Sequence, residues 1–166
     1  RRFREDLATL NPIHVFKNAI GAANLHFNAR FHEGEQTANI IHDRALFMDM
    51  MLRHAWNRFR WSQHICLLAV GGYGRRERHS QSDIDLLILI RWGNPRRHQK
   101  NIEAFLTVLW DIQLKIGHSV RTLSHCVAEA KIDITVVTNL METRTIAGDE
   151  RLRQALNKKT GQKKIW

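Results

Sequence analysis

Apolar and polar residues follow two different patterns along this 166-residue chain. Between residues 35 and 60, apolar residues recur every three or four positions, which predicts a long helix with one buried face. Two short, continuous apolar runs follow, "HICLLAV" at residues 64–70 and "IDLLILI" at residues 84–90. Continuous runs of this length between turn residues are typical of strands that are buried on both faces. This part of the chain therefore predicts a helix followed by two buried strands.

The rest of the chain continues with alternating helix and strand patterns. Apolar spacing predicts a helix over residues 97–114, and "KIGHSVRT" predicts a third strand. The segments "LSHCVAEA" and "ITVVTNLMETR" have helical spacing, although β-branched residues leave the second open to a strand. A brief extended piece, "TIAGD", precedes a last helix, for which Asp149 is placed as the N-cap. This order predicts the α/β (α+β) class, with a small mixed sheet flanked by helices.

The start of the chain has a weaker pattern, which Pro12, Gly21 and Gly34 are expected to interrupt. We therefore predict an N-terminal segment over residues 1–34 and one domain over residues 35–166, which is long enough for a hydrophobic core. No apolar run approaches the ~20 residues of a membrane span, and no signal-peptide pattern is visible. These features predict a cytoplasmic protein that does not contact a membrane.

The balance of charge narrows the class of partner. The formal net charge is +10, which favours an anionic partner such as a nucleotide, an acidic protein or a nucleic acid. Basic residues are not interleaved with aromatic residues for stacking bases, so nucleic acid is the least favoured of these. Cys66 and Cys126 have no metal-binding spacing, and we expect them to be reduced thiols in the core.

The candidate chemistry lies between the two buried strands. Gly71 and Gly72 end the first apolar run, and Asp83 and Asp85 open the second. Side chains two residues apart on a strand point to the same face, about 6.6–7 Å apart, so this pair can converge on magnesium ions. Backbone N–H groups in a glycine turn form a concave anion site, and Arg75 is placed to contact a phosphate oxygen. The spacing therefore predicts a triphosphate held between the turn and metal-bound aspartates.

Each of these features alone has a simpler explanation. Two aspartates one residue apart occur often by chance, and most glycine pairs after a strand are ordinary turns. The combination of buried strand, glycine pair, polar loop and aspartate pair is more specific. Asp85 strengthens it, because it lies within an apolar run where we expect burial, and a buried carboxylate without a partner is costly. A bound cation would compensate that charge.

At these residues the chain resembles the nucleotidyltransferase superfamily that includes polymerase beta. The segments "AVGGYGRRERHSQSDIDLLIL", "FLTVLWDIQLKIGHSVRT" and "DITVVTNLMETRTIAGD" are similar to the N-terminal nucleotidyltransferase domain of the bacterial protein-PII uridylyltransferases. The resemblance covers about residues 41–156. "GHSVRT" is its most family-specific piece, because other nucleotidyltransferases do not carry it.

The resemblance implies an enzyme with the polymerase-beta-like fold that transfers UMP from UTP to a tyrosine of the PII nitrogen-signalling protein and releases pyrophosphate. It implies a requirement for Mg²⁺ and a place in the bacterial cytoplasm. Carried over by position, Asp83 and Asp85 would hold the metal, and Gly71 and Gly72 would cradle phosphates. Ser82 would support the turn or contact a phosphate.

Two positions depart from the family's pattern. Family members usually read "GRGELHP" where this chain reads "GRRERHS", so Arg76 replaces a glycine and Arg78 replaces an apolar residue. If position 76 needs a positive φ, arginine there costs about 1–2 kcal/mol. Near a triphosphate, the charge of Arg78 could aid binding or compete with the metal.

A third carboxylate, which the superfamily often takes from a later strand, is not evident. The strand "KIGHSVRT" contains none, so Asp111 and Asp133 are the candidates, each of which also fits a helix surface or a helix cap. His118 and Arg121 are alternatives for direct contact with the nucleotide, although His118 fits a core histidine equally well.

Two other functions stay open. One is a nucleotidyltransferase with another acceptor, such as glutamine synthetase or tRNA. The other is a noncatalytic remnant that binds a nucleotide or a partner protein. The resemblance also implies that the complete enzyme has further domains, which leaves the activity of the isolated chain an open question.

Overall fold

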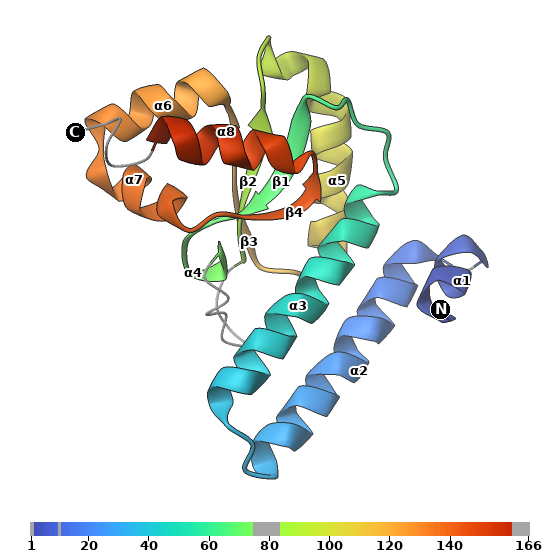
Figure 1. Ribbon diagram of the computed structural model, residues 1–166. Helices are drawn as coiled ribbons and strands as arrows, with labels where there is room; N and C mark the ends of the chain where they lie inside the picture. The colour runs from blue at the N-terminus through green and yellow to red at the C-terminus, as the bar shows by residue number, and fades with distance from the viewer. Residues whose placement is uncertain (1, 10, 75–83, 161–166) are drawn as a thin grey trace.

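The computed structural model describes residues 2–9, 11–74 and 84–160 (Figure 1). The strands are β1 (Ile65–Ala69), β2 (Ile84–Ile90), β3 (Ile116–Thr122) and β4 (Arg144–Gly148). The helices are α1 (Arg2–Thr9), α2 (Pro12–His32), α3 (Thr37–Trp56), the one-turn α4 (Gly71–Gly74), α5 (Gln99–Asp111), which follows the 3-10 turn η1 (Pro95–His98), α6 (Leu123–Ile132), α7 (Ile134–Met141) and α8 (Glu150–Thr160).

The described strands form one mixed sheet in the order β3-β2-β1-β4. β1 runs antiparallel to both β2 and β4, whereas β2 runs parallel to β3. Asp85 lies opposite Gly117 in the parallel pair, and Leu86 lies opposite Ala69 in the antiparallel pair. The predicted α/β class, with a small mixed sheet flanked by helices, is confirmed.

Helices cover both faces of the sheet, as Figure 1 shows. On one face, Ile84 and Ile88 of β2 pack with residues of α3 and α5 in the larger core cluster. On the other face, Leu87 and Leu89 pack with residues of α6, α7 and α8. Both apolar runs are therefore buried strands, as predicted, because each strand is apolar on the two faces that the helices cover.

The N-terminal residues form helices that pack along α3. Pro12 begins α2 and Gly34 follows its end, as predicted, but α2 continues through Gly21, so the predicted break at that glycine is wrong. Phe16 and Phe27 of α2 are buried. A glycine inside a helix costs about 1 kcal/mol, and the burial of two phenylalanines outweighs that cost.

The two C-terminal helices owe their starts to aspartate caps. The carboxylate of Asp133 accepts a hydrogen bond from the Thr135 N–H at 2.9 Å, so the segment left open between helix and strand is the helix α7. Asp149 accepts one from the Arg151 N–H at 2.9 Å at the start of α8, which confirms the predicted cap.

Both cysteines are free thiols buried on the α8 side of the sheet. Burial raises the pKa of Cys66 to about 12 and that of Cys126 to about 11. The prediction of reduced thiols in the core is therefore confirmed.

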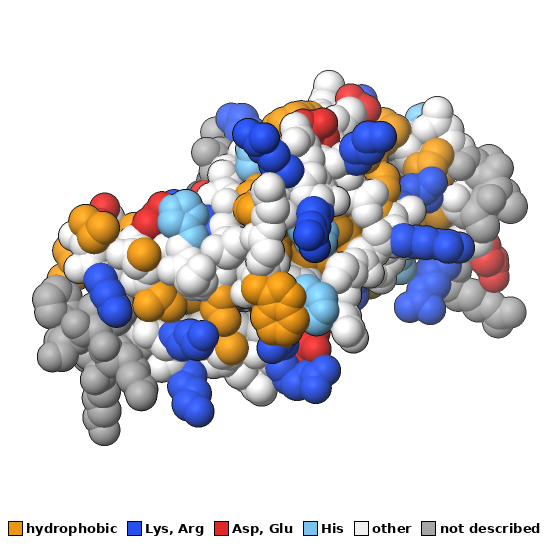
Figure 2. Space-filling model, turned by 90° about the horizontal axis from the view of Figure 1, so that it is seen from above, with side chains coloured by type: hydrophobic (Ala, Val, Ile, Leu, Met, Phe, Trp, Pro, Cys, Tyr) orange, Lys and Arg blue, Asp and Glu red, His pale blue; other side chains and the backbone are white. Residues whose placement is uncertain are grey.

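Positive charge is dispersed over the face seen from above. Figure 2 shows Lys and Arg side chains on this face in separate groups, divided by neutral and apolar surface. The net charge of +10 is thus not gathered there into a single basic patch. Within the described part of the chain, every helix is too short or too polar to cross a membrane.

Candidate active site

The glycine turn and the start of β2 meet at one end of the sheet. Because β1 and β2 are antiparallel, the end of β1 lies beside the beginning of β2, and the Val70 N–H donates to the Asp85 carbonyl at 3.1 Å. Gly71 follows with a φ of +60°, a left-handed conformation that favours glycine. The turn that becomes α4 therefore starts next to Asp85.

The Asp85 carboxylate lies between two glycines. A Cβ atom on Gly71 would lie 3.3 Å from Asp85 Oδ2, and one on Gly117 would lie 2.9 Å from Asp85 Oδ1. Gly117 does not have a positive φ, so it is the lack of a side chain rather than backbone freedom that matters there. We call Gly71 and Gly117, with the carboxylate between them, the glycine cradle.

A groove opens beside the glycine cradle, between the sheet and α7. It consists of a pocket of about 320 Å³ and an adjoining hollow of about 110 Å³. The pocket is lined by Val70, Gly71, Asp85, Leu86, Gly117, His118, Ser119 and Asn139, and the hollow adds Leu87, Arg121, Val136 and Leu140. Small-molecule sites typically measure roughly 300–1,000 Å³, so the groove has the size of a ligand site.

Asp85 is exposed, which corrects the expectation that it is buried in the apolar run. It shares the strand face of Leu87 and Leu89, which helices α6 to α8 cover, but it is at the start of the strand, where the groove opens. Because the carboxylate is exposed, the cost of burying a charge is no reason to expect a cation at Asp85. The oxygen atoms that line the pocket are the reason to consider one.

The oxygen atoms of the pocket fit a magnesium ion. Asp85 supplies a carboxylate, Ser119 a hydroxyl and Asn139 an amide oxygen, and hard oxygen donors of this kind suit Mg²⁺, which usually takes one or two carboxylates and keeps several waters. Within residues 2–9, 11–74 and 84–160, no three His, Cys, Asp or Glu side chains come together to hold a metal on their own. Asp85 is the one carboxylate among the described residues that line the pocket, so a second carboxylate for a metal here would have to come from outside the described residues.

The structure brings together Gly71, Gly72 and Asp85 of the predicted site residues. Gly72 is the second residue of α4, directly after the cradle glycine. Asp83, Arg75 and Ser82 lie outside the described residues, so their predicted roles stay predictions. Arg76, Arg78 and His79 of the same loop also lie outside them.

Neither candidate for a third carboxylate lines the groove. Asp133 is the cap of α7, where hydrogen bonds from the side chain and backbone of Thr135 hold the pKa of its carboxyl below its usual range. Asp111 is an exposed residue at the end of α5, on the opposite side of the sheet. Their alternative roles as a cap and a helix-surface residue are the ones that the structure supports.

The two strand residues proposed for nucleotide contact point to different faces. His118 is exposed, so it is not a core histidine, and its ring lies 6.0 Å from that of Trp110 on α5. Arg121 lies in the hollow on the Asp85 side, where its Nη1 is 2.7 Å from Glu129 Oε2. Both residues line the groove, His118 at the pocket and Arg121 at the hollow.

Sequence reasoning missed Gly117, Ser119 and Asn139. The first two belong to "GHSVRT", which the resemblance singled out, but only the parallel register with β2 places them beside Asp85. Asn139 is an ordinary polar residue of an amphipathic helix until α7 is seen to pack over the groove. No signal in the sequence marked it.

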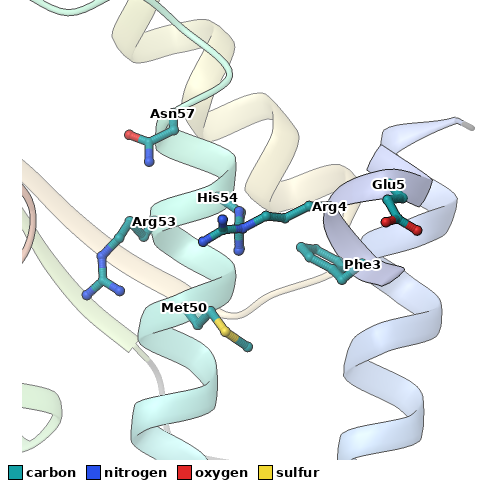
Figure 3. Close-up of a pocket in the computed structure, with 7 residues that line it drawn as sticks. All are labelled: Phe3, Arg4, Glu5, Met50, Arg53, His54 and Asn57. Carbon is teal, nitrogen blue, oxygen red and sulfur yellow. The ribbon is translucent and has the colours of Figure 1, made fainter. Parts of the chain in front are cut away.

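A larger pocket of about 690 Å³ lies elsewhere, between α1 and α3. Figure 3 shows Arg4 reaching from α1 toward His54, while Arg53 points from α3 toward the sheet, where its Nε donates to the Ile146 carbonyl at 2.8 Å. Burial and then the charges of Arg4 and Arg53 lower the pKa of His54. None of the described residues of the predicted site lines this pocket.

Comparison with known proteins gives close relatives over almost the whole chain. Proteins of Azotobacter vinelandii (strain DJ) and Ectopseudomonas mendocina (strain ymp) are each 49% identical to it over 99% of its length, and one of Stutzerimonas stutzeri (strain A1501) is 48% identical over the same share. All three are named bifunctional uridylyltransferase/uridylyl-removing enzyme. The chain spans 19% of the length of these curated relatives. No protein-family model matches it.

Proposed function

Because this chain belongs, in the segment that it covers, to the family of bifunctional uridylyltransferase/uridylyl-removing enzymes, we propose that it is their nucleotidyltransferase part. The reaction is the Mg²⁺-dependent transfer of UMP from UTP to a tyrosine hydroxyl of the PII signalling protein, in the cytoplasm. The tyrosine oxygen forms a bond to the α-phosphorus, and the bond from that phosphorus to the β-phosphate breaks to release pyrophosphate. The observation that carries the proposal is the Asp85 carboxylate in its glycine cradle at the mouth of the groove.

Asp85, together with Asp83, would hold the magnesium ion. When bound, the metal lowers the pKa of the attacking hydroxyl and neutralises charge on the transferred phosphate. The oxygen atoms of Ser119 and Asn139 lie around the same pocket and are available to the metal's waters. The close fit of Gly71 and Gly117 fixes the direction in which the Asp85 carboxylate points.

The glycine turn binds the phosphates. With φ at +60° and no side chain, Gly71 lets a ligand approach the backbone, and the N–H groups of the turn donate to phosphate oxygens. Arg75 and Ser82 follow in sequence and are proposed to add contacts there. The groove beyond the cradle, with Arg121 in its hollow, receives the rest of the nucleotide.

The tyrosine within this segment is not placed to be the acceptor. The chain contains one tyrosine, Tyr73, and its residue surface is 2% exposed. A tyrosine at that depth cannot reach the groove as an acceptor. Transfer to tyrosine therefore requires an acceptor from outside these 166 residues, and we propose that PII supplies it.

The test is transfer of label from UTP. The chain is mixed with Mg²⁺, UTP labelled in the α-phosphate and PII, and label is expected on PII. Asp85→Asn should reduce the rate by at least about 100-fold, because it removes a charge that stabilises the transition state. Asp111→Asn is the matched control, an exposed aspartate outside the groove that should leave the rate unchanged.

Other results of the transfer assay would support one of the two alternative functions. Label on glutamine synthetase or tRNA, but not on PII, means a nucleotidyltransferase with another acceptor. Binding of the nucleotide without transfer to any of these acceptors means a noncatalytic binding domain. Equal rates for the unmodified chain and Asp85→Asn contradict the assignment of the site.

A further inference from the structure

A buried polar network lies beneath the glycine turn, outside the groove. Tyr73, the third residue of α4, is buried, and its hydroxyl donates to Asp49 Oδ1 on α3 at 2.5 Å. The guanidinium of Arg144 on β4 lies over the Tyr73 ring, 4.8 Å from its centre. Three elements that are far apart in sequence therefore meet at one residue of the turn.

Arg144 joins the members of this network. Its Nε donates to Asp49 Oδ2 at 2.8 Å and its Nη2 to Asp49 Oδ1 at 2.7 Å, a two-pronged pairing with the carboxylate. Its Nη1 donates to the Tyr73 carbonyl at 2.6 Å. Tyr73 is thus held by its side chain through Asp49 and by its backbone through Arg144.

The two anchors of the network are themselves fixed to the core. Asp49 is 6% exposed within α3, next to core residues such as Met48. Arg53 of α3 also donates to the Ile146 carbonyl of β4 at 2.8 Å, so α3 and β4 are tied at a second point. The turn that carries Gly71 and Gly72 cannot tilt without breaking hydrogen bonds to this rigid base.

Stability alone does not account for such a network. A buried ion pair is often no more stabilising than apolar residues of the same volume, because both charges lose their hydration. Here one prong of the arginine is directed at the Tyr73 carbonyl, which belongs to the turn itself. One hydrogen bond of the network therefore ends on the backbone of the turn that carries Gly71 and Gly72, and the others join Tyr73 and Arg144 to Asp49.

The geometry points to Asp49, Tyr73 and Arg144 as positioning residues that orient the glycine turn toward the β- and γ-phosphates of the nucleotide. This inference rests on the proposed function, in which the turn binds those phosphates. None of the three residues lines the groove, so they act through the turn and not on the nucleotide. Loosening the network should therefore weaken the binding of UTP more than that of UMP, which lacks the two outer phosphates.

Two variants test the network with little change in volume. Tyr73→Phe keeps the buried ring and removes the hydroxyl that binds Asp49. Arg144→Lys keeps the positive charge but cannot pair with Asp49 through two prongs and also bind the Tyr73 carbonyl. The matched control is Arg30→Lys, a part-buried arginine that pairs with Glu35 and Asp43 at the junction of α2 and α3.

The measurement is calorimetric titration of each protein with UTP and with UMP in Mg²⁺, together with its Tm. Tyr73→Phe should weaken UTP binding about tenfold, the equivalent of one hydrogen bond to a charged group, and UMP binding by less than about twofold. Arg144→Lys should likewise raise the Kd for UTP relative to the Kd for UMP. Arg30→Lys should leave the ratio unchanged even if its Tm falls.

The results separate the inference from the function on which it rests. If the unmodified chain does not bind UTP, the proposed function and this inference both fail. If it binds UTP and the ratio of Kd values is unchanged in Tyr73→Phe, the network is a structural element only and the inference alone is overturned. Should Arg144→Lys fail to fold, the result with Tyr73→Phe decides.

Discussion

Replacing Gly117 with alanine should disable the site while leaving the fold almost unchanged. The new Cβ would lie 2.9 Å from Asp85 Oδ1, where ordinary contact begins at 3.4 Å, so the carboxylate oxygen must move by at least about half an ångström, 3.4 minus 2.9. The atom that must move is at the end of an exposed side chain and does not belong to the backbone. The substitution therefore acts on the direction of Asp85.

The two effects of Gly117→Ala can be estimated separately. Turning Asp85 away from its preferred rotamer costs about 0.5–1.5 kcal/mol, and replacing a strand glycine with alanine returns about 0.5–1 kcal/mol. The free energy of unfolding should thus change by less than about 1 kcal/mol. A displacement of ~1 Å in a catalytic group can lower the rate about 100-fold. The carboxylate oxygen of Asp85 must move by at least about half that distance, so the rate of UMP transfer should fall roughly 10- to 100-fold.

The assay pairs urea unfolding with the initial rate of UMP transfer. Gly148→Ala is the contrasting glycine, because its Cβ would lie 2.6 Å from the Cβ and 2.7 Å from the Cα of Cys66, with φ at +95°. Those atoms belong to the sheet and cannot turn aside, so about 2–5 kcal/mol of stability should be lost. A Gly117→Ala protein with normal stability and a normal transfer rate would refute the glycine cradle, and one that unfolds readily would refute the steric reasoning.

Three further predictions concern stability and reactivity. Asp49→Ala removes the buried carboxylate that pairs with the part-buried Arg144 and should lower the free energy of unfolding in urea by about 3–5 kcal/mol. Because the pKa of Asp133 is lowered in the folded protein, its ionised carboxylate adds stability at pH values above its ordinary pKa of 3.8. That stability is lost as the pH falls through the lowered pKa, so the difference in Tm between Asp133→Ala and the unmodified protein should be smaller below pH 3.8 than at pH 7. With thiol pKa values of about 12 and about 11, Cys66 and Cys126 should react with a disulfide reagent at pH 8 only after denaturant is added.

The order of helices and strands was predictable from the sequence because it depends on local patterns. The spacing of apolar residues predicted the long helix α3, and the continuous apolar runs predicted the buried strands β1 and β2. The capping residues of α7 and α8 were also predictable, because each lies next to the helix that it starts. The error at Gly21 has a non-local cause. The packing of α2 against α3 stabilises the helix across Gly21, and the helix propensities of the individual residues do not include this contribution.

The site was predictable only in part, for a similar reason. The turn at Gly71 and the carboxylate of Asp85 belong to one motif, and the antiparallel pairing of its two strands places them together. Gly117 reaches Asp85 only through the parallel register of β3. Asp49 and Arg144 are 95 positions apart, so no spacing along the chain indicates that they meet under the turn. The exposure of Asp85 likewise depends on the pocket that forms beside it between segments distant in sequence.

Binding of a metal–nucleotide complex at Asp85 is the most direct test of this account. Mn²⁺ can replace Mg²⁺ at oxygen sites of this kind and can be followed by electron paramagnetic resonance. In a titration of the chain with Mn²⁺ and UTP, a bound Mn²⁺ signal is expected for the unmodified protein and for Asp111→Asn, and this signal should be lost in Asp85→Asn. A bound signal of the same strength and affinity in Asp85→Asn would contradict it.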